Sequence, residues 1–223
     1  MPIMACSQSL SNPDKSLADW LEQLDFASGT PLGRSNQGEV RRFRIGDTDL
    51  AIKTPNGRGV LRWLRMQSLK REYRTYRRLE GLPGFARCYG LFDERYLVLD
   101  YIDGEDFRHA YLADRKQFFD RLLETLRSMH ARGVAHGDLK RKDNLRVDRD
   151  SRPVILDLGT AVRRKPDGGW LNRKLFEFIR QTDLNAWVKL KYGSYDEVAS
   201  QDRSLLRRSR LERSLSRWWP GRR

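Results

Sequence analysis

The stretch HGDLKRKDN, residues 136–144, places a carboxylate, an ammonium group and an amide close together, directly before a short apolar segment. Phosphoryl transfer needs little covalent chemistry from a protein. It needs an acceptor for the hydroxyl proton, a cation beside the transferring phosphate, and oxygen ligands for magnesium. Asp138, Lys140 and Asn144 could supply these in turn. By itself the stretch also fits a solvated surface loop, so other motifs have to agree with it.

A glycine-rich segment, GRSNQGEV, lies upstream at residues 33–40. It matches the pattern G-x-G-x-x-G-x-V except that Ser35 replaces the middle glycine. Small residues at Gly33, Ser35 and Gly38 let backbone amides approach the phosphates of a nucleotide, because a larger side chain would hold them away. The alternative interpretation of this segment is an ordinary hairpin turn.

A lysine ends the next strand-like segment, which runs from Asp49 to Lys53. Lys53 could neutralise the α and β phosphates of a nucleotide, or it could protect the edge of a sheet. Glu72 follows in a segment whose apolar residues recur at helical spacing. This carboxylate could hold the lysine in an ion pair, or it could face solvent beside Lys70 and Arg71.

The segment PVILDLG, residues 153–159, reads as a buried strand that ends in an aspartate and then a glycine. Asp157 could join Asn144 as a magnesium ligand, since Mg²⁺ prefers oxygen donors. Gly159 would give the backbone the freedom to turn away from the strand.

In this order, the four motifs resemble the protein-kinase-like superfamily over about residues 31–195. The resemblance implies an α+β, two-lobed fold with an antiparallel-sheet small lobe and a reduced helical large lobe, which binds ATP and Mg²⁺. It implies that Glu72 pairs with Lys53, that Asp138 is the catalytic base and that Lys140 lies at the γ-phosphate. It also implies that Asn144 and Asp157 are magnesium ligands. The residues that it implies for nucleotide binding are Gly33, Ser35, Gly38, Val40 and Lys53.

Residues 97–104, LVLDYIDG, resemble the family's hinge between the lobes, where extended backbone binds adenine. The resemblance places Leu99 behind the base and lets Asp100 and Ile102 bind it through their main chains. Apolar residues on one face of residues 115–132 predict the buried helix that precedes the catalytic stretch.

The chain is thereby divided into four parts. A leader with a short helix at Leu17 to Phe26 occupies residues 1–30, and the small lobe with the hinge occupies 31–102. The large lobe follows at 103–195, and a basic C-terminal tail takes up 196–223.

Three departures set the chain apart from regulated protein kinases. Asp138 and Asn144 lie six positions apart, one more than usual, so Asp143 is an alternative ligand, although the strand that follows favours Asn144. Gly137 stands where many such kinases carry an arginine that pairs with an activation-loop phosphate. The segment after Gly159 reaches the next helix-like run in about a dozen residues without an A-P-E motif. This leaves no room for a long activation loop or its peptide-docking platform.

The H-G-D pattern, the missing activation loop and residues 180–191 resemble the lipopolysaccharide core kinases that act on Kdo and heptose, and more distantly the RIO-type protein kinases. The first group implies a sugar hydroxyl on a glycolipid as acceptor, and the second implies a serine or threonine hydroxyl. The sequence leaves the acceptor open.

The net charge of the chain indicates which kinds of partner it can bind. The 223 residues suffice for one two-lobed domain, and 44 Lys and Arg against 30 Asp and Glu give a net charge of +14. Anionic partners other than ATP are therefore expected. Residues 203–223 carry eight arginines and one glutamate, with Leu211, Leu215 and Trp218 at helical spacing. This tail could lie on an anionic membrane surface, pack on the large lobe, or remain loose.

The sequence gives less support to nucleic acid as a partner and to a secreted or membrane-spanning protein. No repeating aromatic and basic pattern suggests nucleic-acid binding. Cys6 and Cys88 lack metal-ligand spacing and suit a reducing cytosol, and no apolar run has the length of a signal peptide or a membrane span. We expect a cytoplasmic protein, with peripheral binding at the inner membrane face as an option for the tail.

The sequence as a whole predicts an ATP- and magnesium-dependent phosphotransferase that acts on a hydroxyl of a protein or of a lipopolysaccharide core sugar. Two alternatives remain. One is a pseudokinase scaffold, and the other is a basic membrane-surface binding protein that keeps the fold.

Overall fold

Five antiparallel strands form the main sheet, in the order β1–β2–β3–β5–β4. The computed structural model describes residues 13–34 and 38–208. Together with the helices below, this sheet confirms the predicted α+β class. The strands are β1 (Thr30–Arg34), β2 (Glu39–Ile45), β3 (Thr48–Thr54), β4 (Cys88–Phe92) and β5 (Tyr96–Asp100).

The chain divides into two compact units. The first contains the residues up to Lys70 together with Cys88–Tyr101, and the second contains Arg71–Arg87 together with the residues from Ile102 onward. The boundary after Tyr101 falls inside the segment proposed as a hinge. Residues 71–87, which lie between the two segments of the first unit, group with the second unit.

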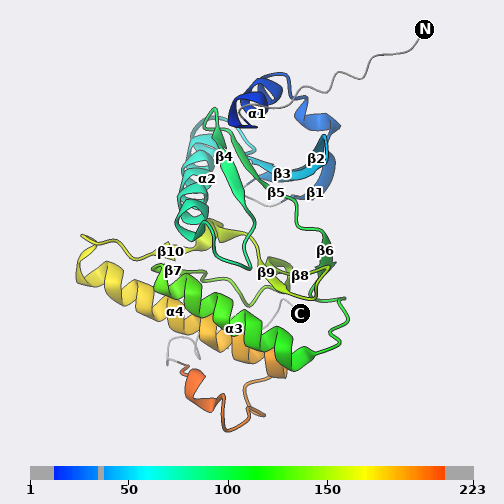
Figure 1. The fold of residues 1–223 in the computed structure, drawn as a ribbon. Coiled ribbons are helices and arrows are strands. Elements are labelled where there is room, and N and C mark those ends of the chain that lie inside the picture. The colour runs from blue at the N-terminus through cyan, green and yellow to red at the C-terminus, as the bar shows by residue number, and fades with distance from the viewer. Residues whose placement is uncertain (1–12, 35–37, 209–223) are drawn as a thin grey trace. The chain divides into compact units, whose positions relative to one another are not determined.

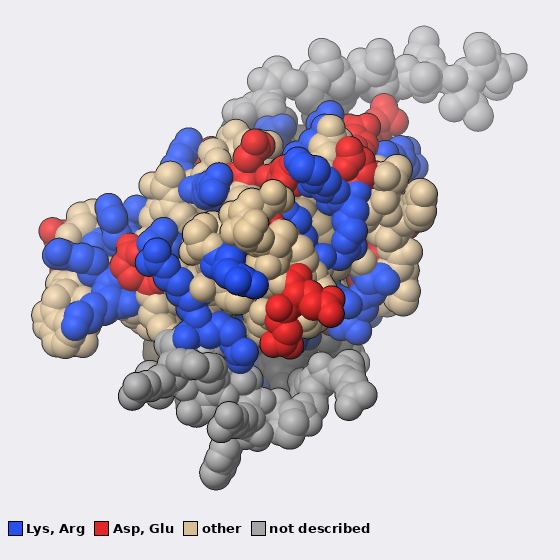
Figure 2. All heavy atoms as spheres, turned by 90° about the horizontal axis from the view of Figure 1, so that it is seen from below, with Lys and Arg blue, Asp and Glu red and all other residues tan. Residues whose placement is uncertain are grey.

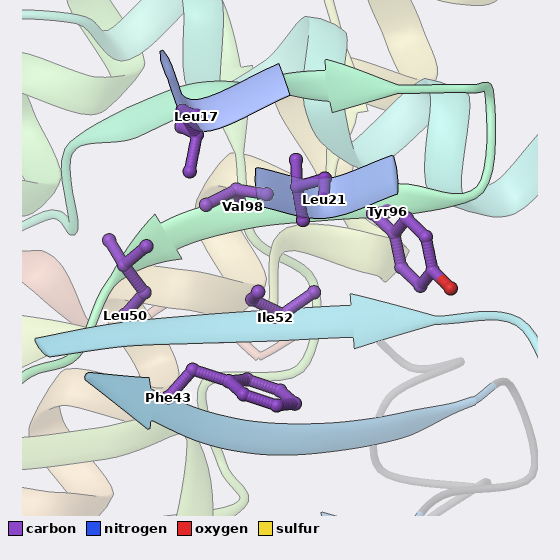
Figure 3. Packing of buried hydrophobic residues seen from close by; sticks show 7 residues of the cluster. All are labelled: Leu17, Leu21, Phe43, Leu50, Ile52, Tyr96 and Val98. Atoms are coloured by element: carbon purple, nitrogen blue, oxygen red, sulfur yellow. The ribbon is translucent and has the colours of Figure 1, made fainter. Parts of the chain in front are cut away.

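One face of the sheet carries the core of the first unit. Alternate residues of a strand point to the same face, and β3 accordingly buries Leu50 and Ile52 against Phe43 of β2. Helix α1 (Pro13–Glu22) covers this face, and Figure 3 shows Leu17 and Leu21 directed at the sheet residues. The helix begins and ends four residues earlier than the predicted helix at Leu17 to Phe26, and its Leu17 and Leu21 belong to the core of the sheet.

Helix α2 (Gly59–Leu79) has a buried stripe that includes an acid. Leu69, Glu72, Tyr76 and Leu79 follow spacings of three, four and three, which place them on one face, and all four are buried. The stripe excludes the interpretation of Glu72 as a solvent-facing charge.

Two helices form the main part of the second unit, and Figure 1 shows them side by side. Helix α3 (Arg115–Ala131) confirms the helix predicted at 115–132, and the Asp114 carboxylate caps it by accepting the Gln117 N–H. Helix α4 (Gly169–Tyr192) is longer than the helix-like run predicted from Leu171 to Arg180. The indole of Trp187 packs against Phe119 and donates its N–H to the Phe119 carbonyl over 2.8 Å.

Short strands and turns connect these helices. The connection from Gly159 to α4 spans only residues 160–168. The small sheets are β6–β8–β9 and β7–β10, built from β6 (Gly104–Asp106), β7 (Val134–Ala135), β8 (Leu145–Asp148), β9 (Pro153–Ile155) and β10 (Val162–Arg163). Single 3-10 turns occur at Phe26–Ser28, Lys142–Asn144, Leu158–Thr160 and Arg203–Leu205.

The first part of the predicted C-terminal tail packs on α4. Lys191 pairs with Asp202 over 2.6 Å, and the Gln181 side chain donates to the Leu205 carbonyl over 2.8 Å. The apolar stripe predicted from Leu211 to Trp218 lies outside the described residues. Within the described part of the chain, no helix has both the length and the apolar character needed to cross a membrane.

Candidate active site

Sheet register places the predicted phosphate-binding residues of the first unit in one row. Val40 of β2 lies opposite Lys53 of β3, and Gly33 of β1 lies opposite Val40. Directly opposed residues point to the same face, so Val40 and Lys53 share a face. It is the face opposite Leu50 and Ile52, because residues of β3 alternate between the two faces.

The two described glycines of the glycine-rich segment have different surroundings. A Cβ added to Gly38 would lie 2.4 Å from the Thr54 carbonyl oxygen, so close packing against the end of β3 requires glycine there. A Cβ added to Gly33 would have nothing within 4 Å. Ser35 lies outside the described residues.

Main-chain hydrogen bonds show which way the main-chain groups point at the end of β5, where adenine binding is predicted. The Tyr101 N–H donates to the Asp49 carbonyl over 2.9 Å. Because bonded and non-bonded pairs alternate in an antiparallel ladder, the main-chain groups of Asp100, opposite Leu50, point away from β3. The Asp100 carboxylate accepts the Tyr89 hydroxyl over 2.7 Å. Adenine binding by Asp100 and Ile102 stays a prediction.

In the second unit, the stretch 136–144 forms a loop with a buried anchor. Leu139 is buried and separates the half-buried Asp138 from the exposed Lys140. The Asn144 side chain donates its amide N–H to the Asp138 carbonyl over 2.9 Å, which closes the loop on itself. This bond assigns Nδ2 and leaves Oδ1 as the ligand atom of the amide.

The β8–β9 hairpin brings Asp157 to the same loop. Leu145 lies opposite Ile155, and the Leu156 N–H donates to the Asn144 carbonyl over 2.9 Å. Asp157 follows directly, with a φ of 55°, a left-handed conformation that is uncommon for residues other than glycine. The structure therefore gathers Asp138, Asn144 and Asp157, which are separated by up to 19 positions in the sequence.

Burial raises the pKa of the Asp138 carboxyl above its ordinary value, and the negative charge of Asp157 adds to the rise. The Arg141 guanidinium, 3.8 Å from Asp138 Oδ2, opposes this shift in pKa without reversing it. A higher pKa makes the carboxylate a stronger proton acceptor at neutral pH.

Asp143 and Asn144 have different surroundings, which bears on the choice between them as metal ligand. Asp143 is exposed, and its Oδ1 pairs with Arg108 Nε over 2.9 Å. The Asn144 side chain is only 4% exposed and bonds to the loop that carries Asp138. The geometry favours Asn144.

His136 braces the loop and does not face solvent. Its Nδ1 accepts the Asp138 N–H over 3.2 Å, so Nε2 carries the proton and donates to the Leu156 carbonyl over 2.9 Å. The ring thereby joins the backbone before Asp157 to the backbone of Asp138.

Asp183 of α4 is the positioning residue that the sequence interpretation missed. Its carboxylate is 0% exposed and accepts the His136 N–H over 2.8 Å and the Gly137 N–H over 2.9 Å. The His130 Nε2 lies 3.0 Å from the same carboxylate. A signal existed in the sequence, because Asp183 keeps helical spacing with the buried Phe176 and Trp187.

Gly137 lies between the two bonds to Asp183 and has a φ of 83°. A Cβ there would sit 3.3 Å from Ile179 Cγ2, and its residue would be held in the left-handed region. The loop backbone therefore requires glycine at this position for conformational reasons.

The donor chemistry of this loop fits a magnesium ion. Asn144 offers an amide oxygen and Asp157 a carboxylate, and both are hard oxygen ligands of the kind that Mg²⁺ takes beside phosphate oxygens and water. Glu72 and Lys53 are both buried, and they belong to different units of the chain.

Comparison with known proteins agrees with these features. The family model described as protein kinase domain matches residues 26–174, about two thirds of the chain. CBL-interacting protein kinase 9 of Oryza sativa subsp. japonica is 29% identical over 64% of this chain and 34% of its own length. Serine/threonine-protein kinase cds1 of Schizosaccharomyces pombe is 33% identical over 50% of this chain and 27% of its own.

A CDPK-related protein kinase of Daucus carota is 26% identical over 64% of this chain and 27% of its own length. The chain thus spans about a third or less of these curated relatives. The match with the family model covers the glycine-rich segment, Lys53, the loop at 136–144 and Asp157. The chain therefore belongs to the protein kinase domain family.

Proposed function

We propose that the protein is an ATP- and Mg²⁺-dependent phosphotransferase that phosphorylates serine or threonine hydroxyls of a protein. The observation that carries the proposal is the grouping of Asp138, Asn144 and Asp157 around one braced loop, with the pKa of Asp138 raised. Such a group combines a proton acceptor with two hard oxygen ligands.

In the proposed reaction, the acceptor hydroxyl oxygen forms a bond to the γ-phosphorus of ATP. The bond from that phosphorus to the β–γ bridging oxygen breaks, and ADP leaves. The hydroxyl proton passes to the Asp138 carboxylate, and Lys140 offsets charge on the phosphoryl oxygens.

Sheet residues of the first unit are the proposed ligands of the nucleotide. Gly33, Val40 and Lys53 would bind it from the sheet, with Lys53 at its α and β phosphates. Bound magnesium would be held by Asn144 and Asp157 and would neutralise phosphate charge.

The names of the relatives favour a protein acceptor, because the first two are described as a CBL-interacting protein kinase and a serine/threonine-protein kinase. One observation favours a second candidate, a lipopolysaccharide core sugar. The connection at residues 160–168 is too short for a long activation loop with a peptide platform. A glycolipid acceptor would not need that platform.

Transfer of label from γ-labelled ATP tests the activity and the acceptor together. The purified full chain is incubated with Mg²⁺ and a generic protein substrate, lipopolysaccharide core, or no acceptor, beside Asp138→Asn. Asp143→Asn is the matched control, because it makes the same change on the same loop at an exposed position. We expect label on protein with the wild type and Asp143→Asn, and none with Asp138→Asn.

Each other result identifies a different function. Label on the glycolipid alone would replace the protein acceptor by the core sugar. Nucleotide binding without transfer, with equal background in the wild type and Asp138→Asn, would establish the pseudokinase alternative.

We propose separately that the protein is cytoplasmic and that its basic C-terminal tail contacts anionic lipid. Eight arginines against one glutamate in residues 203–223 support this through charge. Sedimentation with phosphatidylglycerol vesicles should be lost on truncation after Arg208. Equal sedimentation of both chains would contradict the proposal.

A further inference from the structure

A cavity of about 410 Å³ lies between α3 and α4 in the second unit. It is separate from the residues assigned to catalysis, because Asp138, Asn144 and Asp157 do not line it. Its volume is within the range of pockets that hold small organic molecules. It is lined by Arg127, His130, Ala131, Arg164, Phe176, Glu177, Arg180, Leu184 and Leu205.

The charge of the lining is predominantly positive. Arg180 pairs with Glu177 over 2.7 Å, which accounts for the acid in the lining. Over the described residues, neither Arg127 nor Arg164 forms an ion pair with a carboxylate. Figure 2 shows Lys and Arg side chains over much of the face drawn there, with Asp and Glu side chains among them. Two guanidinium groups at one cavity are suited to a phosphate or carboxylate.

The remaining lining is apolar. Phe176 is buried, and Leu184 and Leu205 are partly buried beside it. A purely inorganic anion would leave these side chains without a partner in the cavity, whereas an anion with a hydrocarbon body would cover them. We propose that the cavity binds a small organic anion with a phosphate or carboxylate head and an apolar body.

The cavity is connected to the catalytic loop by two side chains. His130 lines it and contacts the Asp183 carboxylate, which in turn holds the main-chain N–H groups of His136 and Gly137. A ligand in the cavity would contact His130, whose Nε2 lies 3.0 Å from the Asp183 carboxylate. Occupancy therefore alters the support of the loop that carries Asp138, and this second part of the inference rests on the proposed phosphotransferase function.

Calorimetric titration of the full chain with hexyl phosphate, without nucleotide, tests the site. Inorganic phosphate and hexanol probe the charged and apolar halves separately. The variant pair Arg127→Glu and Arg164→Glu, combined in one chain, should weaken hexyl phosphate binding by at least about tenfold. Lys174→Glu is the matched control, because it reverses an exposed charge on α4 outside the cavity.

Binding of hexyl phosphate that is saturable, tighter than that of inorganic phosphate and hexanol, and unchanged in Lys174→Glu supports the site. Absence of saturable binding, or equal binding by the double variant, overturns it. These results need no activity, so failure of the site is distinguishable from failure of the proposed reaction.

Phosphoryl transfer measured at saturating hexyl phosphate then tests the connection. A change in kcat in the wild type that is absent in the double variant supports it. An unchanged kcat in a protein that has bound the probe overturns the connection and leaves the binding site standing.

Discussion

The sheet of the first unit and the loop at 136–144 in the second position their polar residues by different physical means. In the sheet, Val40 and Lys53 share a face because β2 and β3 pair in one register, and the register follows from the alternation of buried residues. In the loop, Asp138 and Asn144 are held by a buried polar network that includes His136 and Asp183.

The two regions differ in how well they tolerate the loss of a side chain. A strand residue keeps its place through many main-chain bonds and apolar contacts, so the loss of one side chain leaves the register intact. A loop held by one buried carboxylate depends on that carboxylate, because its N–H partners would lose their acceptor away from water. Substitutions should therefore have larger consequences in the loop than in the sheet.

The largest effect should come from Asp138 itself. Asp138→Asn removes the proton acceptor but keeps the shape of the side chain, so we expect phosphoryl transfer to fall by about 10²–10⁴-fold with the fold retained. Steady-state kinetics measure the rate of transfer, and circular dichroism shows whether the fold is retained. Asp143→Asn should change the rate by less than about threefold on the same scale, since it lies outside the proposed catalytic group. Similar losses in both variants would contradict the assignment of the base.

Asp183→Ala should have the next largest effect, on stability as well as rate. The substitution leaves the N–H groups of His136 and Gly137 without their acceptor, which should cost about 3–5 kcal/mol of unfolding free energy. Denaturant unfolding gives the value. Glu124→Ala, an exposed acid on α3, should stay within about 0.5 kcal/mol. A cost for Asp183→Ala as small as this control would show that the network does not hold the loop.

A pair of glycine substitutions compares the two regions directly. Gly137→Ala forces an alanine into a φ of 83° beside Ile179 and should cost about 1–2 kcal/mol of stability. Gly33→Ala in β1 meets open space and should change stability by less than about 0.5 kcal/mol. Thermal unfolding of both variants provides the measurement, and an equal cost at the two positions would remove the contrast.

The smallest effect should be the pH dependence of Asp138. Its pKa is raised in the folded state, so the protonated carboxyl is the form that the fold favours. Its contribution to stability is present below the unfolded pKa and is lost as pH rises through the folded pKa. Asp138→Asn should therefore be slightly more stable than the wild type at pH 7, with a difference that shrinks toward pH 4. Melting temperatures across this range would show the opposite trend if the pKa were lowered.

Much of the fold could be predicted because its signals are local. The spacing of Phe118, Leu122 and Met129 predicted α3, and the strand-like segment from Asp49 to Lys53 predicted β3. The packing of α1 on the sheet could not be predicted in this way. Its contribution depends on Leu17 and Leu21 meeting Ile52 and Val98, which are far away in the sequence.

The candidate site shows the same division. Asp138, Asn144 and Asp157 could be selected from their motifs, and the choice of Asn144 over Asp143 rested on the strand that follows. Asp183 was missed because its partners are backbone N–H groups 46 and 47 positions earlier, and no side-chain motif records a main-chain bond. The buried face of α4 gave only an indirect signal.

By itself, the sequence determined the kinds of chemical group available, their order along the chain, and the helices and strands that carry them, because these follow from residue type and local periodicity. Only the tertiary structure decided the burial of Glu72, the bracing of the loop by Asp183 and the shift in the pKa of Asp138. The physical reason is that burial, long-range hydrogen bonds and local dielectric depend on which distant segments meet.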